Sequence, residues 1–354
     1  MDSAPAGTAF RISSGVHHRF AVRPKSDDVF IGAPGAVLDG DGVTPSAFYA
    51  TDAVSSNSVT IEGTSARERL VVRDYDNGGS EQIGAIQPAA SPSVRANHWI
   101  LRYLEVTGSF SRGVTTSDYM TVEDCLIDHN GRLGLGGSGD GVVVLGNEIA
   151  FNDTRNVAPG FENGGAKLSK TNGLLFRDNY VHDNTGPGIW TDIDADSSSV
   201  EDNTVLHNSG IGVLNEISHN TVIDGNRIIG NGWAQTGALK GAGIEISSSF
   251  GSTIYGNRLE SNHAGIIALQ ANRGSGRFGP HLLDQLEVHD NIVDGPGLTG
   301  VVQSVGDPSL FTSRSLRFLR DHYQAARFVW MGHTGLSWAQ WQADGQDPGG
   351  TWAP

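Results

Sequence analysis

Residues 200–208 read VEDNTVLHN, and residues 223–231 read IDGNRIIGN. Each stretch places an Asn three residues after one apolar side chain and two residues before another, and a second Asn follows the first by five residues. The two stretches lie 23 residues apart. Self-similarity at a fixed period is typical of repeat proteins, so further copies are expected on both sides.

The same pattern recurs through the middle of the chain. The first Asn column consists of Asn147, Asn179, Asn203, Asn226, Asn257 and Asn291, with Cys125 one repeat earlier. The second Asn column consists of Asn130, Asn152, Asn184, Asn208, Asn231 and Asn262. The spacings in the first column are 22, 32, 24, 23, 31 and 34 residues, which indicates a basic repeat of 22–24 residues with insertions in three places.

A repeat of this length, with period-2 apolar alternation interrupted by Gly and Asn, predicts three short strands and three turns. Stacked copies would form one coil each of a parallel β-helix, with like side chains about 4.8 Å apart. Asn side chains stacked at the bends would hydrogen-bond along the column and satisfy turn backbone groups. We therefore interpret the Asn columns as structural and Cys125 as a small buried residue.

Four segments resemble a known group of proteins: 164–171 (GGAKLSKT), 181–194 (VHDNTGPGIWTDID), 215–218 (NEIS) and 345–347 (GQD). They are similar to bacterial right-handed parallel β-helix repeat proteins of the pectin-lyase-like superfamily, over about residues 5 to 350. The resemblance implies an all-β, right-handed solenoid. It also implies a polysaccharide-acting protein, because the superfamily includes pectate and alginate lyases, polygalacturonase-like hydrolases and uronan epimerases.

The two ends of the chain differ from its middle. We expect an N-terminal cap and first coil over residues 1–40, the parallel β-helix over 41–305 and a C-terminal capping segment over 306–354. Four of the seven Trp lie in the last segment, where the repeat is expected to stop: Trp330, Trp338, Trp341 and Trp352. A solenoid end exposes apolar core, so a Trp-rich segment is expected to cover it.

Composition excludes some partners. The chain of 354 residues carries a formal net charge of −15, which repels nucleic acid and anionic membranes. No apolar run approaches the roughly 18 residues of a membrane span. The acidic charge and the resemblance favour an extracellular protein whose leader has been removed, with a cytoplasmic location as the alternative.

The strand that follows the second Asn column carries most of the candidate chemistry. Alternation predicts two outward-facing columns on it: Lys167, Trp190, Leu214, Glu245 and Ile267, then Ser169, Asp192, Glu216, Ser247 and Leu269. Insertions 153–164 and 232–242 precede this strand, and insertion 272–284 follows it. Loops on a rigid scaffold often hold binding residues, so these insertions predict a groove over Trp190, Asp192 and Glu216.

The carboxylates in these columns are the predicted catalytic groups. Asp192 and Glu216 are expected about 5 Å apart, as in a retaining glycosidase, whereas Glu216 and Glu245 are expected about 8 Å apart, as in an inverting one. Both pairs remain open. Lys167 is the candidate base of a β-elimination instead.

Five residues are predicted to contact substrate: Trp190, Asp194, His219, Trp233 and Arg273. An indole offers an apolar platform for a sugar ring, and His219 is a candidate acid or base.

Calcium is the one cofactor that the sequence suggests, and no cofactor at all is the alternative. Asp192, Asp194 and Asp196 form an oxygen-rich run of the kind that Ca²⁺ binds. The resemblance implies the same ion, which bridges enzyme and substrate uronate in β-helix lyases.

Taken together, the sequence predicts a carbohydrate-active enzyme that cleaves glycosidic bonds of an extracellular polysaccharide or oligosaccharide, by hydrolysis or by β-elimination. The alternatives are a uronan epimerase and a non-catalytic β-helix that binds glycan or protein.

Overall fold

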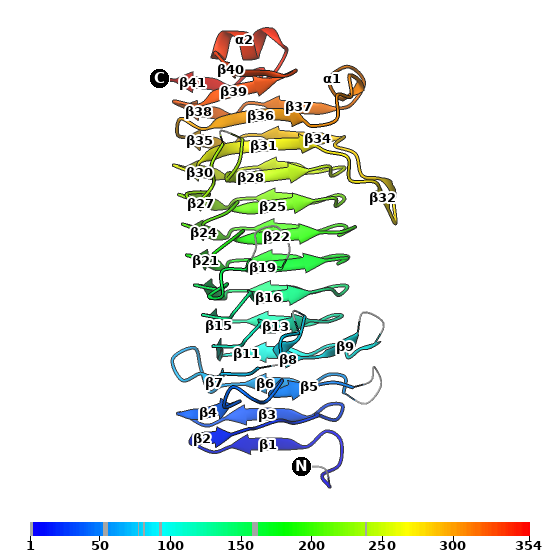
Figure 1. The fold of residues 1–354 in the computed structure, drawn as a ribbon, viewed down its shortest axis with the longest axis vertical. Coiled ribbons are helices and arrows are strands. Elements are labelled where there is room, and N and C mark those ends of the chain that lie inside the picture. Colours follow the sequence, from blue (N-terminus) through cyan, green and yellow to red (C-terminus); the bar gives the residue numbers. More distant parts are fainter. Residues whose placement is uncertain are drawn as a thin grey trace. The chain divides into compact units, whose positions relative to one another are not determined.

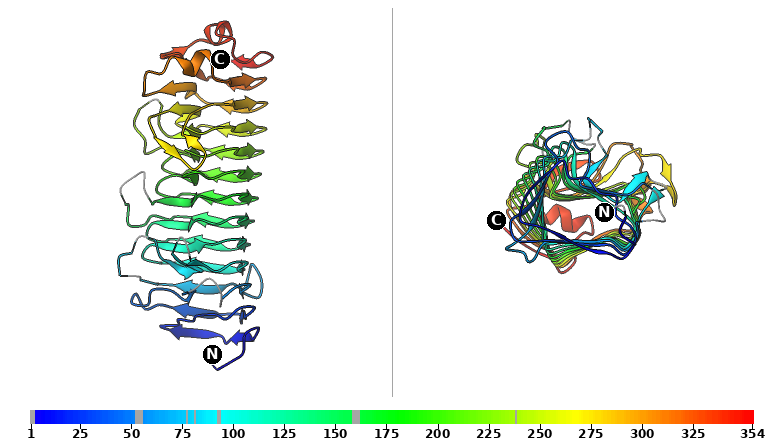
Figure 2. Two further views of the ribbon diagram at one scale, coloured as in Figure 1. Left: turned by 90° about the vertical axis from the view of Figure 1, so that its right-hand side faces the viewer. Right: turned by 90° about the horizontal axis from the view of Figure 1, so that it is seen from below.

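The structure, a computed structural model, describes residues 3–51, 56–76, 78–80, 82–91, 94–157, 162–237 and 239–354. The chain divides into two compact units, Met1–Tyr180 and Val181–Pro354, and strand β21 (Tyr180–His182) spans the boundary. Each unit consists of coils of short strands, and equivalent strands of successive coils pair in parallel (Figures 1 and 2). The predicted all-β, right-handed parallel β-helix is confirmed.

Among its described residues, the first unit contains strands of three parallel sheets and one small antiparallel pair. The first sheet is β1 (Ala9–Ile12), β3 (Val29–Gly32), β6 (Thr60–Glu62), β11 (Ile100–Arg102), β14 (Thr121–Glu123), β17 (Val143–Leu145) and β20 (Leu175–Arg177). The second is β2 (Gly15–His18), β4 (Ala36–Asp39), β7 (Leu70–Arg73), β12 (Leu104–Thr107), β15 (Leu126–Asp128) and β18 (Glu148–Ala150). The third is β5 (Phe48–Tyr49), β8 (Gly84–Gln87), β13 (Arg112–Thr116), β16 (Leu133–Gly137) and β19 (Gly164–Ser169), and β9 (Ala89–Ser91) pairs with β10 (Val94–Arg95).

The second unit repeats this arrangement. Its first sheet is β23 (Ser199–Glu201), β26 (Val222–Asp224), β29 (Thr253–Tyr255), β34 (Leu286–His289) and β37 (Leu316–Leu319). Its second is β24 (Thr204–Leu206), β27 (Arg227–Ile229), β30 (Arg258–Glu260), β35 (Ile292–Asp294), β38 (His322–Gln324) and β41 (Thr351–Ala353). Its third is β22 (Ile189–Asp192), β25 (Val213–Glu216), β28 (Ala242–Ser247), β31 (Ala264–Gln270), β36 (Leu298–Gln303) and β39 (Arg327–Trp330), with β40 (His333–Leu336) antiparallel to β39.

Stacked aliphatic side chains form the core, as the apolar columns predict. Val205, Ile228 and Leu259 occupy equivalent positions of β24, β27 and β30 and are buried, while their neighbours along each strand are partly exposed. Alternation along a strand sends successive side chains to opposite faces, so one residue per three-residue strand enters the core. Repetition of that residue in each coil makes the core continuous within a unit.

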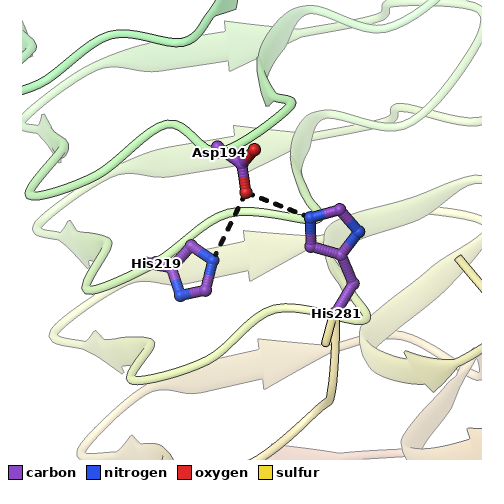
Figure 3. Close-up of side chains that lie close together, drawn as sticks. All are labelled: Asp194, His219 and His281. Carbon is purple, nitrogen blue, oxygen red and sulfur yellow. Dashed lines mark hydrogen bonds and ion pairs between the residues drawn. The ribbon is translucent and has the colours of Figure 1, made fainter. Parts of the chain in front are cut away.

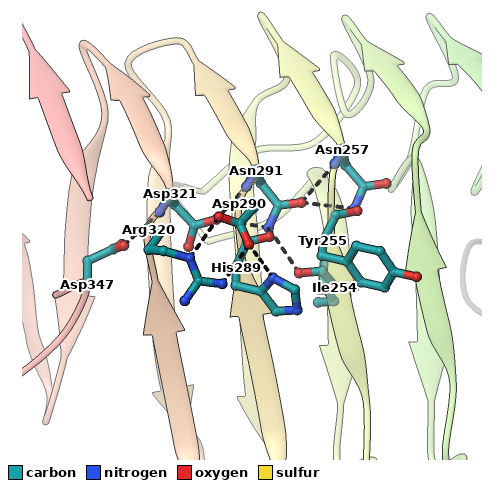
Figure 4. Close-up of polar contacts among 9 residues, drawn as sticks. All are labelled: Ile254, Tyr255, Asn257, His289, Asp290, Asn291, Arg320, Asp321 and Asp347. Atoms are coloured by element: carbon teal, nitrogen blue, oxygen red, sulfur yellow. Dashed lines mark hydrogen bonds and ion pairs between the residues drawn. The ribbon is translucent and has the colours of Figure 1, made fainter. Parts of the chain in front are cut away.

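The Asn columns are hydrogen-bonded ladders. Asn226 Oδ1 accepts the backbone N–H and the side-chain N–H of Asn203, and Asn226 in turn donates to Asn257 Oδ1 in the next coil. Asn291 then donates to Asp321 Oδ1, and the Asp321 N–H donates to Asp347 Oδ1 (Figure 4). These bonds satisfy turn groups that lie inside the protein, which is the structural role predicted for the Asn residues.

Cys125 occupies its predicted place in a ladder. Its N–H donates to Asn147 Oδ1, the residue is buried, and burial raises the pKa of the thiol to about 12. A thiol with such a pKa stays protonated at neutral pH, so Cys125 acts as a small core residue.

The C-terminal segment continues the coil before it covers the end. Strands β37, β38 and β39 pair in parallel with β34, β35 and β36, so parallel pairing extends past the boundary expected at residue 305. The Asn signature is absent there because Asp321 takes the Asn position. The short helix α1 (Ser309–Thr312) lies in the connection between β36 and β37, and the short helix α2 (Trp338–Ala343) follows β40.

Aromatic side chains gather at this end, as the Trp-rich sequence predicts. Trp341 of α2 is buried and stacks on Phe328 with ring centroids 4.9 Å apart, and it meets Trp330 edge-on. Neither helix of the described residues is long and apolar enough to cross a membrane.

Candidate active site

The third sheet of the second unit aligns the predicted outward columns. Trp190 pairs with Leu214, Leu214 with Glu245, and Glu245 with Ile267 along β22, β25, β28 and β31. In the next column Glu216 pairs with Ser247. The predicted register is therefore confirmed for these pairs, and it places Glu245 one strand away from Glu216 and two residues along.

Glu245 has apolar neighbours on both sides in its column. Leu214 and Ile267 are buried, and Leu239 of insertion 232–242 packs against the cluster that contains Ile267. Burial and the nearby negative charge of Glu216 raise the pKa of the Glu245 carboxyl to about 7, although Lys240 acts in the opposite direction. Glu245 is thus a carboxylic acid that is partly protonated at neutral pH, which is the property of a catalytic proton donor.

Glu216 is held by the insertion that follows β31. Residues 272–284 form a hairpin with strands β32 (Ser275–Gly276) and β33 (Gly279–Pro280), called the 272–284 hairpin below. The Arg273 guanidinium forms an ion pair with Glu216 Oε1. The structure thus brings together Arg273 and Glu216, which the sequence named separately as binding and catalytic residues.

Three of the predicted site residues, Asp192, Trp190 and Lys167, are buried. Asp192 Oδ1 accepts the N–H of Ile193, and the Asp192 side chain is almost inaccessible. Trp190 exposes only 3% of its surface, so its ring does not form the open platform that the sequence suggested. Leu214, the next residue in the same column, is also buried. Lys167 lies in β19 of the first unit and is also buried.

Trp233 is the exposed aromatic residue of insertion 232–242. It exposes 67% of its surface, and its indole N–H donates to the His207 carbonyl at 3.0 Å. The hydrogen bond holds the indole nitrogen in place while most of the side chain stays exposed. Residues 158–161 of the first insertion and residue 238 of the second lie outside the described residues.

A second cluster lies beside the 272–284 hairpin (Figure 3). Asp194 Oδ1 is 3.1 Å from His281 Nε2 and 3.8 Å from His219 Nε2, and Asp194 Oδ2 accepts the N–H of Arg277 at 2.8 Å. Burial by itself would raise the pKa of Asp194, but the hydrogen bonds from Arg277 and His281 hold it below its ordinary value. Sequence reasoning named Asp194 and His219 but missed His281, because the insertion that carries it has no counterpart in the other repeats.

The predicted calcium ligands Asp192, Asp194 and Asp196 do not gather into one group of ligand atoms in the part of the chain that the structure describes. Asp194 turns toward His281 and Arg277, whereas Asp196 Oδ1 accepts a hydrogen bond from Asn220 Nδ2. The cause is local. Bridges pair Asp196 with His219, so the turn after Asp192 contains one residue more than the turn after Glu216. Asp194, with φ of 54°, lies in this longer turn.

A cleft of about 690 Å³ lies beside the hairpin. Its lining includes Arg273 and His281 of the hairpin, together with Ser304 and Arg314. Arg314 is fixed by bonds to Gln270 and Asp307, so its charge stays at the cleft wall.

Comparison with known proteins agrees with the fold. Residues 94–259 match the family described as right handed beta helix region, and no curated protein matches the sequence. The structure of XylC in complex with xylose is similar with a TM-score of 0.59 at 14% identity, covering 82% of this chain and 54% of that one. The chain thus spans about half the length of XylC.

Two further similar structures act on polymers of mannuronic acid. The A-module of the mannuronan C-5 epimerase AlgE6 from Azotobacter vinelandii has a TM-score of 0.58 at 14% identity, covering 98% of this chain and 91% of that one. A mannuronic acid specific polysaccharide family 6 lyase from human gut microbiota has a TM-score of 0.55 at 14% identity. The match covers 97% of this chain and 80% of that one. Residues 94–259 thus resemble the right-handed β-helix family, and the similar structures share the parallel β-helix fold with this chain.

Proposed function

We propose that the protein hydrolyses a glycosidic bond of a polysaccharide or oligosaccharide, with Glu245 as the proton donor and Glu216 as the second carboxylate. The observation that carries this proposal is the contrast between two neighbouring carboxyl groups. Glu245 has a pKa of about 7 beside apolar neighbours, whereas Glu216 forms an ion pair with Arg273. Glycosidases require one carboxylic acid and one carboxylate on opposite sides of the bond.

In the proposed reaction the Glu245 proton passes to the glycosidic oxygen as the bond to the anomeric carbon breaks. Glu216, oriented by Arg273, removes a proton from the attacking water. Two residues along a strand and one strand across correspond to about 8 Å, which leaves room for that water and predicts inversion at the anomeric carbon. The alternative partner of Glu216 is Asp192, about 5 Å away by the same geometry, and that pair predicts retention.

The exposed Trp233 supports a sugar substrate, because an indole face packs well against the apolar face of a pyranose. The net charge of −15 is consistent with action outside the cell and with neutral rather than polyanionic substrates. We propose a secreted enzyme that acts on a neutral or weakly charged glycan.

A product assay on a polysaccharide panel tests the proposal. Hydrolysis produces new reducing ends without the ultraviolet absorbance of an unsaturated uronide. Appearance of that absorbance would instead support elimination with Lys167 as base, and its loss on chelation would support the calcium expected for that reaction. A change in uronate configuration without cleavage, detected by NMR of the treated polymer, would identify an epimerase. A polymer that binds to the protein but is not changed would identify a non-catalytic binding protein.

A further inference from the structure

We propose that Asp194, His219 and His281 bind a divalent transition metal ion of the zinc class, and that this ion fastens the 272–284 hairpin to the coil. One ligand atom from each residue lies within 4.8 Å of the others. Asp194 and His219 come from turns of two successive coils, and His281 comes from the hairpin. The inference does not depend on the hydrolytic activity proposed above.

His219 is the first sign of a missing ligand. Its ring is 9% exposed, and Nε2 has no hydrogen-bond partner among the described residues. This nitrogen is directed at Asp194 Oδ1 across 3.8 Å, which is too far for a hydrogen bond (Figure 3). A buried polar atom without a partner requires an explanation, and an ion held between these three residues supplies one.

His281 adds a second constraint. Its Nδ1 is 3.1 Å from the Arg273 carbonyl oxygen, which can only accept, so Nδ1 carries a hydrogen. Its Nε2 faces Asp194 Oδ1 at 3.1 Å. A proton between these two atoms would satisfy them but would leave His219 unpaired, whereas a metal ion satisfies all three ligand atoms.

The surroundings resemble those of a metal centre. Metal-binding His residues usually donate their other N–H to a carbonyl or carboxylate, and ligating carboxylates are themselves hydrogen-bonded. His281 meets the first condition through Arg273, and Asp194 meets the second through the Arg277 N–H. Phe278 packs edge-on against His219 with ring centroids 4.7 Å apart, so an apolar ring lies beside the proposed ligand.

The ligand set selects the class of ion. Imidazole nitrogens favour Zn²⁺, Co²⁺, Ni²⁺ or Cu²⁺ over Ca²⁺ and Mg²⁺, which prefer oxygen. Ligands of a tetrahedral zinc site at about 2.0–2.1 Å from the metal lie about 3.3 Å apart, close to the separations measured from Asp194 Oδ1. Three protein ligands leave one position for water or a ligand group.

The ion would order the hairpin and thereby position Arg273. Gly276 allows the hairpin to approach, because a Cβ at this position would lie 2.1 Å from Asp194 Oδ1. Arg273, eight residues before His281, carries the guanidinium that pairs with Glu216. Metal binding is therefore expected to decrease the mobility of the segment that reaches the carboxylates.

The test begins with the full chain, stripped by a chelator and then titrated with Zn²⁺ and, separately, Co²⁺. We expect about one tightly bound ion per chain, a higher melting temperature with the ion and intense visible bands of tetrahedral Co²⁺. His219→Gln and His281→Gln should each weaken binding at least about 100-fold and abolish the Co²⁺ bands. His289→Gln should bind the ion as the wild type does, because that ring pairs with Asp290 at the surface.

A second control addresses the other His and Asp cluster, His18, Asp39 and Asp41, which is mostly exposed and whose members already bond to one another and to Arg73. His18→Gln should leave the tight ion in place. If the wild type binds no ion, melts identically with and without metal, or retains the ion in both His219→Gln and His281→Gln, the proposal is overturned. Should either variant fail to fold, the wild-type titration and its Co²⁺ spectrum still decide the question.

Discussion

At the scale of single residues, two glutamates on one sheet face differ because of their neighbours. Glu245 lies between Leu214 and Ile267 in its column, which removes water and favours the protonated carboxyl. Glu216 lies one strand away, where Arg273 reaches it from the hairpin. The sequence places both glutamates on the strand, but the difference in protonation depends on residues far apart in the chain.

Glu245→Gln tests the proton donor. The variant should fold normally and lose at least about 10²-fold in kcat on the hydrolysed substrate. Because the pKa of Glu245 is raised to about 7, its acid form predominates below that pH, so wild-type kcat/KM should fall as pH rises through about 7. The residual activity of the variant should not show this decrease in kcat/KM as pH rises. Asp294→Asn, a substitution in β35 of another sheet, serves as the control and should leave both the rate and its pH profile unchanged.

Asp321→Asn tests the end of the Asn ladder. Burial and the charge of Asp347 raise the pKa of Asp321 to about 8 in the folded protein, above the ordinary 3.8. The folded state therefore holds an extra proton between about pH 4 and pH 8, and its free energy of unfolding decreases as pH rises across that window. An amide keeps the acceptor for Asn291 without this proton.

We therefore expect Asp321→Asn to raise the free energy of unfolding at pH 8 by at least about 1 kcal/mol and to have little effect at pH 4. Thermal melts at both pH values measure the difference. Exposed Asp344→Asn should show no such pH-dependent gain, and a variant at Asp321 that is less stable at pH 8 than the wild type would refute the assignment of a protonated carboxyl.

At the scale of elements, the repeats could be predicted and the insertions could not. The columns around Asn203 and Asn226 fix strand positions and register, because a slip of one residue would expose the whole aliphatic column. The 272–284 hairpin has no equivalent coil, so neither its pairing nor the position of His281 follows from the repeat. The burial of Trp190 was missed because strand alternation gives the face of a side chain but not what covers that face.

Asn226→Ala tests the ladder as a structural element. The change removes the acceptor for the Asn203 N–H and side-chain amide, and the donor to the Val200 carbonyl. Buried groups left without partners should lower the free energy of unfolding by about 2–4 kcal/mol. Urea unfolding should show a lower midpoint. The exposed Asn272→Ala should change it by less than about 0.5 kcal/mol, and equal effects of the two changes would contradict a structural ladder.

Gly276→Ala tests the contact between hairpin and coil. The added Cβ would overlap the Asp194 carboxylate, so the hairpin should move outward and Arg273 should leave Glu216. Limited proteolysis should cut within residues 272–284 faster than in the wild type, and kcat should fall between about 10- and 100-fold. The neighbouring Ser275→Ala adds no bulk and should do neither. Unchanged cleavage in Gly276→Ala would show that the hairpin is not held by this contact.

At the scale of the whole molecule, each unit has its own stacked core, and the chemistry proposed here lies in the second. Strands β37 to β39 extend the coil of that unit beyond the boundary expected from the Asn pattern, because Asp321 and Asp347 replace Asn with an equivalent acceptor. The fold was therefore predictable from periodicity. Predicting where the coil ends would also have required knowing that Asp can replace Asn in the hydrogen-bonded ladder. The similar structures share this scaffold at 14% identity, so the reaction depends on the side chains of this chain.

The most direct test of the central claim is the rate of reducing-end release by Glu216→Gln on a glycan that the wild type cleaves, with melting temperature measured in parallel. Our account predicts a variant that melts within a few degrees of the wild type and releases reducing ends at least about 10²-fold more slowly. A Glu216→Gln protein that melts like the wild type and retains its full rate would contradict the proposal that this carboxylate cleaves the glycosidic bond.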